Sequence, residues 1–333
     1  MIPVRRGLKG PVALPVDDAF LPKEKVQWWY WTGHLDDEAG KHYGFEVVFF
    51  AFPDLGSQLC QVALTDVAAN RFYFKEYIID FQLPVRIPDV IDLATKKGEV
   101  TARGPGGREH LFGTIKDDLI LDLELEAQAP PVLHYGGNAH PYRFGGYTYY
   151  YSREDMIARG TIKMGDKTLN VTGTAWFDRQ YGALYRAIDK GWQWFAIRLD
   201  DGRRIMLFDF RGKEADIERY GSLTDDTNLT RDLGPNDYRV TIKDTWKSPH
   251  TGCTYPMGWD VTIGDLNLKV EPMVVDQELR ATHGYWAGPE YWEGACRVSG
   301  DQTGTAYVEL NGYCRGMLGA IGKEKPEKGV SSD

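Results

Sequence analysis

The sequence predicts an all-β protein made of two similar antiparallel modules, each a β-barrel or a β-sandwich. Three observations support this fold class. Aromatic residues are abundant (10 Trp, 19 Tyr and 14 Phe), and short alternating apolar runs end at turns rich in Gly, Asp and Asn. Helical periodicity is weak along the whole chain. A ten-residue segment near the start also recurs past the middle, as a duplicated module requires.

The repeated segment starts at Trp28 in one copy and at Trp192 in the other, 164 residues apart. Aligned without a gap, the copies share this Trp, aromatic residues at the third and fourth positions, and a closing Leu-Asp-Asp. Each copy then passes through a turn into an apolar strand, at 44–50 and 205–210. Because the offset equals about one domain, the sequence predicts a duplicated β module.

The chain divides most naturally at the short connector 183–190. We therefore expect a first module over residues 10–186 and a second over 187–320, packed against each other. The segment 323–333, rich in Lys, Glu and Ser, predicts a flexible tail. Clean alternation of apolar and acidic residues, as at 119–126, places one face of such a strand in a core.

Composition excludes several classes of function. The net charge is −9 over 333 residues and there is no basic stripe, so nucleic acid is not an expected partner. No apolar run reaches the roughly 18 residues of a membrane span, and the N-terminus has no signal-peptide pattern. We therefore expect a cytoplasmic protein, or one from which a leader has been removed. Phosphate-loop and dinucleotide-binding motifs are missing, and we therefore expect no cofactor.

The histidines and cysteines give no metal pattern. His34 and His42 flank a hairpin, and His134 and His140 belong to a Gly-rich loop, so we expect structural or solvated roles and no bound metal. None of the four cysteines forms a CxxC motif. Without paired spacing or a secretory signal, we expect all four to be reduced thiols. The cysteines are Cys60, Cys253, Cys296 and Cys314.

The aromatic run 28–31 has two interpretations. It can fill the bottom of a barrel, which is the plainer one. Alternation along a strand, however, puts two of its four aromatic side chains on each face. Because both faces are then aromatic, we expect one of them to line a cavity or the seam between the modules.

Two carboxylic acids occur in aromatic surroundings. Asp178 ends the run 173–178, and Glu293 follows Trp292. A buried carboxyl is costly unless it is paired, so each acid can be structural, through Arg179 or Arg297 respectively. The alternative is a catalytic acid whose pKa is raised by an apolar pocket.

These segments together resemble the signature blocks of the carotenoid 1,2-hydratase-like family, also called the hydroxyneurosporene synthase or AttH-like family. The blocks occur in the family's order and span about residues 27–312; they are residues 28–35, 149–152, 173–178, 192–195 and 291–294. The resemblance implies two lipocalin-like β-barrel domains packed together. It also implies relatives that add water to a terpenoid double bond and, more distantly, fungal Diels–Alderases. Gln27, where family members often carry Glu, and the segment 179–181 depart from the pattern, which argues against carotenoid hydratase activity more than against the fold.

The leading functional hypothesis is a cofactor-independent enzyme that hydrates or cyclises an apolar, unsaturated terpenoid or polyene. Asp178 and Glu293 are the candidate catalytic residues, in a pocket near the junction of the modules. The candidate aromatic walls are Trp29, Trp31, Trp176, Tyr181, Trp194, Trp286 and Trp292. Two alternatives remain: a pericyclase of polyketide polyenes, which needs only a shaped pocket, and a protein that binds a lipophilic ligand without changing it.

Overall fold

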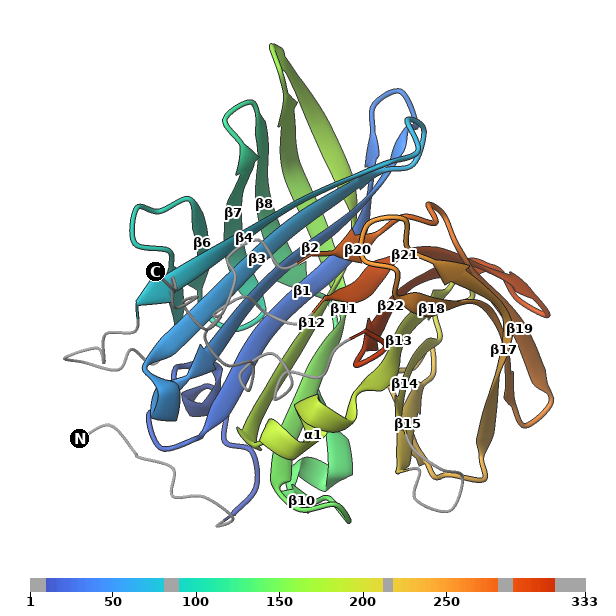
Figure 1. The fold of residues 1–333 in the computed structure, drawn as a ribbon. Coiled ribbons are helices and arrows are strands. Elements are labelled where there is room, and N and C mark those ends of the chain that lie inside the picture. The colour runs from blue at the N-terminus through green and yellow to red at the C-terminus, as the bar shows by residue number, and fades with distance from the viewer. Residues whose placement is uncertain (1–9, 81–89, 212–217, 281–289, 315–333) are drawn as a thin grey trace, which may run out of the picture.

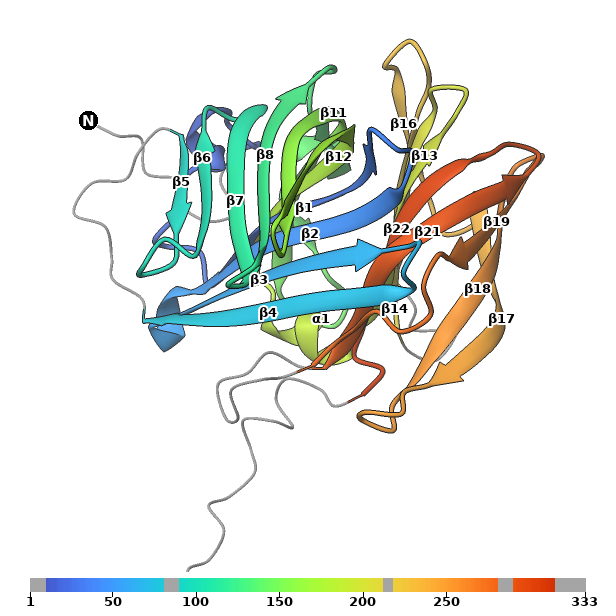
Figure 2. The same ribbon diagram turned by 90° about the horizontal axis from the view of Figure 1, so that it is seen from above.

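The computed structural model describes residues 10–80, 90–211, 218–280 and 290–314. Strands account for 64% of these residues and helices for 6%, so the expected all-β fold is confirmed. Two curled antiparallel sheets, each a half-barrel, lie side by side (Figures 1 and 2). No helix in this part of the chain is long and apolar enough to cross a membrane.

The first sheet contains β1 (Val26–Asp37), β2 (His42–Phe52), β3 (Ser57–Asp66), β4 (Arg71–Asp80), β5 (Ile91–Ala94), β6 (Val100–Gly104), β7 (Arg108–Lys116), β8 (Leu119–Ala127), β9 (Val132–Leu133), β10 (His140–Pro141), β11 (Tyr147–Met164) and β12 (Lys167–Ala183). The second contains β13 (Trp192–Leu199), β14 (Arg204–Phe210), β15 (Arg219–Thr224), β16 (Thr230–Leu233), β17 (Tyr238–Lys247), β18 (Thr254–Ile263), β19 (Leu266–Pro272), β20 (Glu278–Leu279), β21 (Tyr291–Gly300) and β22 (Gly304–Asn311). The short helices are η1 (Val16–Asp18), η2 (Pro53–Leu55), η3 (His134–Gly137) and α1 (Tyr185–Lys190).

The two sheets have the same central topology. Their strand orders are β4-β3-β2-β1-β12-β11-β8-β7-β6-β5 and β16-β15-β14-β13-β22-β21-β19-β18-β17. In each sheet the first strand lies between the second strand and the last one. The repeat that starts at Trp28 and Trp192 therefore occupies equivalent strands, β1 and β13. Helix α1 separates the sheets in the chain; the domain boundary near residue 186 remains a prediction, and the tail 323–333 lies outside the described residues.

Alternation along β1 divides its four aromatic residues between two cores. Trp29 and Trp31 belong to the interior of the first sheet, whereas Trp28 and Tyr30 belong to a separate apolar cluster shared by both sheets. This shared cluster, which we call the seam, also contains Trp192 and Trp194 of β13. Strand β1 is thus buried on both faces, as expected from its composition.

The equivalent strands β1 and β13 meet each other across the seam. Trp28 stacks on Trp192 with ring centroids 6.2 Å apart, and Tyr30 meets Trp194 edge-on at 5.4 Å. Each repeated residue thus contacts its own counterpart, which is the geometry of a two-fold interface. The sheets approach so closely that a Cβ atom on Gly44 of β2 would lie 2.6 Å from the Cβ of Ala295 on β21. The seam is therefore a packed interface that fixes the two sheets relative to each other.

Buried ion pairs and hydrogen bonds attach η1 to the first sheet. Arg179 points into the sheet interior, where its guanidinium lies over the Trp29 ring at 3.9 Å and donates to the carbonyl oxygens of Asp17 and Ala19. Asp18 accepts from Arg153 at 2.8 Å. Arg179 thus faces away from Asp178, and the structural pair considered for these neighbours does not form.

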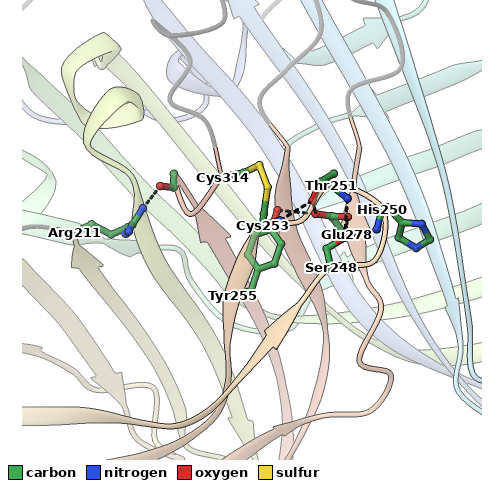
Figure 3. Close-up of a disulfide and its surroundings, with 9 residues drawn as sticks. Arg211, Ser248, His250, Thr251, Cys253, Tyr255, Glu278 and Cys314 are labelled. Carbon is green, nitrogen blue, oxygen red and sulfur yellow. Dashed lines mark hydrogen bonds between the residues drawn. A yellow bond between two sulfur atoms is a disulfide. The ribbon is translucent and has the colours of Figure 1, made fainter.

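The expectation of four reduced cysteines is wrong. Cys253 and Cys314 form a disulfide with their Cα atoms 5.0 Å apart (Figure 3), whereas Cys60 and Cys296 are free and buried. Cys253 lies between β17 and β18, and Cys314 follows β22. Curling of the second sheet brings these positions together although 61 residues separate them. Linear spacing therefore gave no sign of the pair.

Thiol titration in denaturant without reductant should detect two thiols, those of Cys60 and Cys296, because the other two cysteines are joined. After reduction the count should rise to the four cysteines of the sequence. Cys253→Ser should lower the free energy of unfolding by about 2–4 kcal/mol, since the bridge no longer restricts the unfolded chain. Four thiols before reduction would contradict the bridge.

Candidate functional site

The seam is built in rows of side chains that run across the strands, since alternate residues of neighbouring strands share a face. In the first sheet, the register places Ser152, Asp178 and Tyr30 side by side on β11, β12 and β1. In the second, Glu293, Glu309 and Trp194 lie side by side on β21, β22 and β13. The two rows are equivalent by topology and line one cavity between them.

This central cavity has a volume of about 20 Å³. Seven of its lining residues are aromatic and three are carboxylic acids; within the described residues, neither Lys nor Arg lines it. The lining consists of Trp28, Tyr30, Phe50, Tyr150, Asp178, Gln180, Trp192, Trp194, Phe208, Glu293 and Glu309. The cavity therefore combines apolar walls with acids that no cation neutralises.

Asp178 accepts three hydrogen bonds. Ser152 Oγ and Trp176 Nε1 donate to its Oδ1 at 2.5 and 2.7 Å, and the Tyr150 hydroxyl donates to Oδ2. The Tyr150 hydroxyl in turn accepts from Trp194 Nε1 at 3.0 Å, across the seam. Burial raises the pKa of Asp178, and the three donors oppose this, giving a pKa of about 6. Asp178 is therefore mainly ionised at neutral pH.

The acids on the other side of the cavity are in a different state. Glu293 and Glu309 lie directly opposite each other on β21 and β22. The pKa of Glu293 lies far above its usual value, mainly because the side chain is buried and secondly because other carboxyl groups are near. Burial also raises the pKa of Glu309 to about 8. Tyr30 donates to Glu293, and Trp192 Nε1 donates to Glu309 at 2.9 Å. These two acids therefore retain protons at neutral pH.

A further carboxyl stands behind this pair. Glu46 on β2 is fully buried, and burial raises its pKa to about 8. Its Oε1 is 3.4 Å from the Tyr291 hydroxyl, which donates at 2.6 Å to Gln61. Charge repulsion from Glu46 adds to the raised pKa of Glu293, and repulsion from Glu309 adds to that of Glu46. The seam thus contains several neighbouring carboxyl groups, not all of which can be ionised at the same time.

Two further cavities lie along the seam on either side of the central one. The first, of about 40 Å³, is mainly apolar. It shares four residues with the central cavity: Trp28, Phe50, Trp192 and Glu309. The second, of about 20 Å³, has seven polar or charged residues among the twelve that line it, including Thr32, Arg198 and Tyr307. The seam therefore changes from an apolar end, through the carboxylic acids, to a polar end.

Of the predicted site residues, the structure brings Asp178, Glu293 and Trp194 together around the central cavity. Trp176 borders the polar cavity and bonds to Asp178. The other predicted wall residues point away from the seam: Trp29, Trp31 and Tyr181 into the first core and Trp292 into the second. Trp286 lies outside the described residues. Glu293 does not pair with Arg297, which contacts Glu271 instead.

Sequence reasoning missed Glu309, and a second internal repeat could have revealed it. The run Gly173-Thr174-Ala175-Trp176-Phe177-Asp178 recurs as Gly304-Thr305-Ala306-Tyr307-Val308-Glu309. Asp178 lies opposite Tyr30, and Glu309 lies opposite Trp194, at equivalent positions of the two sheets. Trp28, Tyr30, Tyr150, Trp192 and Phe208 were also missed, because alternation alone does not say which face of a strand meets the other module.

Two histidines are buried rather than solvated. His134 Nε2 lies 2.7 Å from Ser152 Oγ, directly behind Asp178, and His34 lines the polar cavity. Burial lowers the pKa of each to about 3, so both are neutral. Since the Ser152 hydroxyl donates to Asp178, His134 Nε2 must carry the proton and donate to Ser152. Within the described residues, no group of three His, Cys, Asp or Glu side chains is arranged to hold a metal.

Comparison with known proteins agrees with this architecture. The sequence model of the AttH-like family matches residues 6–313. An AttH protein from Nitrosomonas europaea is similar in structure, with a TM-score of 0.82 and 28% identity over 92% of this chain and 98% of that one. Kievitone hydratase from Nectria haematococca has a TM-score of 0.74 at 17% identity, over 92% and 94% of the two chains, a likeness that concerns the fold alone. No curated protein matches the chain.

Replacing Glu309 with Gln should change how stability depends on pH. The native protein holds a proton on Glu309 up to about pH 8, whereas the unfolded chain releases it near 4.5. The native state thus binds more protons between these values, and stability falls as pH rises through this window. Glu309→Gln should remove up to about 1.4 kcal/mol of this fall per pH unit. Chemical denaturation at pH 5, 6, 7 and 8 measures it.

Glu271→Gln is the matched control, because Glu271 is half exposed and paired with Arg297. Its pH profile of stability should parallel that of the wild type. An equally parallel profile for Glu309→Gln would mean that Glu309 is ionised in the native protein, against the protonated state described above.

Proposed function

The chain belongs to the AttH-like family, and from this membership and the chemistry of the seam we propose a cofactor-independent enzyme that hydrates or cyclises a carbon–carbon double bond of an apolar small molecule, of terpenoid or polyene type. One observation carries the proposal. Equivalent positions of the two sheets hold an ionised acid, Asp178, and a protonated one, Glu309, on opposite sides of one aromatic cavity. An acid and a base facing each other are what addition of water to an alkene requires.

The proton donor in this proposal is the pair Glu293 and Glu309. Two carboxyls directly opposite each other in a dry site cannot both ionise, so at least one proton remains available at neutral pH. Transfer of that proton to one alkene carbon breaks the π bond and leaves a carbocation on the other carbon. The pair keeps the negative charge until it is reprotonated.

The aromatic walls favour this carbocation. Tyr30, Trp194 and Phe208 line the cavity beside the acids. A desolvated cation over an aromatic face gains about 0.5–2 kcal/mol per ring. The same walls exclude bulk water, which would otherwise quench the cation indiscriminately.

Asp178 completes the reaction as the base. The sequence alone suggested Asp178 as the acid, but its three hydrogen-bond donors favour the ionised form and make the basic role the better one. In hydration, a water oxygen bonds to the cationic carbon while Asp178 takes one of its protons, so that alkene and water become an alcohol. In cyclisation, an internal double bond attacks the cation, and Asp178 takes a proton from carbon.

An assay in labelled solvent tests the proposal. The protein is incubated with kievitone, named as the substrate of a structural neighbour, and with acyclic terpenoid and polyene alkenes, in H₂¹⁸O or in D₂O. Hydration should add one water with ¹⁸O in the new hydroxyl, and either reaction should place deuterium on carbon. A cyclised product without deuterium would support a pericyclase instead. Binding without any product would support a carrier.

Asp178→Asn should lower the rate of product formation by about 10²–10⁴-fold while the Kd for substrate changes little, because shape is kept and the base is lost. Asp209→Asn is the matched control. Asp209 is also buried and accepts from a tyrosine, Tyr238, and from Gln193, but it does not line the cavity. Its variant should retain wild-type activity. Full activity of Asp178→Asn would exclude the basic role.

A further inference from the structure

Three buried polar groups at or beside the polar end of the seam have no hydrogen-bond partner in the described part of the protein. They are Thr32 Oγ1, Tyr307 OH and Glu46 Oε2. Thr32 and Glu46 are fully buried, and Tyr307 is 2% exposed. A buried polar atom without a hydrogen bond costs about 1–3 kcal/mol, so three of them together call for a common partner.

Two of these groups, on Thr32 and Tyr307, line one cavity, and the third, on Glu46, lies beside Thr32 in the sheet. Thr32 and Glu46 lie directly opposite each other on β1 and β2. Tyr307 on β22 lines the same cavity of about 20 Å³ as Thr32, and Glu46 and Glu293 are near enough to add to the effect of burial in raising the pKa of Tyr307. The three groups thus converge across the seam from two sheets, with donors and acceptors among them.

Small side chains make room at this point. Ala196 of β13, the counterpart of Thr32 in the repeat, lines the cavity, and Gly44 and Ala295 border the next positions of the seam. A site with two to four polar partners and enough space is where a protein holds an ordered water.

We propose that Thr32, Glu46 and Tyr307 bind an ordered water, and that this is the water added to the substrate. The second part of this inference rests on the proposed function. The site lies one row from the carboxylic acids, two residues along each strand, a step of about 7 Å. Water can therefore reach a cation in the central cavity from the side of Glu293 and Tyr30 without crossing the apolar end.

Atoms balance in this sequence. Glu293 or Glu309 gives its proton to the alkene, the bound water forms the new C–O bond, and Asp178 accepts the proton that this oxygen loses. A solvent water then refills the site, and the proton on Asp178 returns to the glutamate pair. The net change is one water added per double bond.

Crystal structures of the wild type and of the double variant Thr32→Val/Tyr307→Phe test the water site. At a resolution that shows ordered water, the wild type should contain a water within hydrogen-bond distance of at least two of the three atoms. The double variant, which keeps the shape but removes both hydroxyls, should lose it. Thr174→Val is the control, since Thr174 lines the same cavity but is not one of the three proposed water ligands. This variant should keep the ordered water. A dry site in the wild type would overturn the inference.

The same variants in H₂¹⁸O test the role of this water. Removal of its partners should lower formation of the ¹⁸O-labelled alcohol about tenfold, as expected for one or two hydrogen bonds, and raise the share of cyclised or isomerised product. If the double variant forms labelled alcohol at the wild-type rate, then the bound water is not the water added to the substrate. If the water is present but no alkene is hydrated by the wild type, then the proposed function fails and the role falls with it, while the water site itself stands.

Discussion

The contact between the two copies of the repeated strand is the constraint on which the rest of the molecule depends. Because Trp28 packs on Trp192 and Tyr30 on Trp194, β1 and β13 must each bury both faces, one in its own sheet and one against its counterpart. That requirement explains the consecutive aromatic residues. It also brings the last strand of each sheet, β12 and β22, to the seam with an acid at the same topological position.

Burial raises the pKa of both acids, and their neighbours then make the two pKa values different. The residue beside Asp178 on β11 is Ser152, whose hydroxyl donates to the carboxylate and favours its charge. The residue beside Glu309 on β21 is Glu293, a second carboxyl, and repulsion from Glu309 adds to the effect of burial on the pKa of Glu293. No Lys or Arg lines the central cavity in the described part of the chain to offset either effect. Three hydrogen-bond donors to Asp178, against one donor to Glu309, thus separate a base from an acid at equivalent positions of the two sheets.

The sequence predicted the all-β class, the duplication, and Asp178 and Glu293 as acids near Trp194, because composition, repeats and a carboxyl among aromatic residues are local signals. It did not show which aromatic face meets the other module. Alternation distinguishes two faces of β1 but does not show what each face contacts. The sequence therefore predicts Trp29 and Trp31 as cavity walls, whereas Trp28 and Tyr30 line the cavity. The Cys253–Cys314 bridge depends on how the second sheet curls, which no spacing records.

The departures from symmetry along β1 and β13 also explain why the seam is hollow where it is. At the first two repeated positions large rings meet and fill the space. At the next seam-facing position the pair is Thr32 and Ala196, too small to touch across the same distance, and a cavity opens. Polar groups can be buried in this cavity only if a hydrogen-bond partner is present. One row away, the aromatic rings exclude water from the acids. A seam with an apolar end, a central acid–base pair and a polar end follows from the sizes of three pairs of side chains. The same arrangement would bring an apolar alkene and water to the acids from opposite directions.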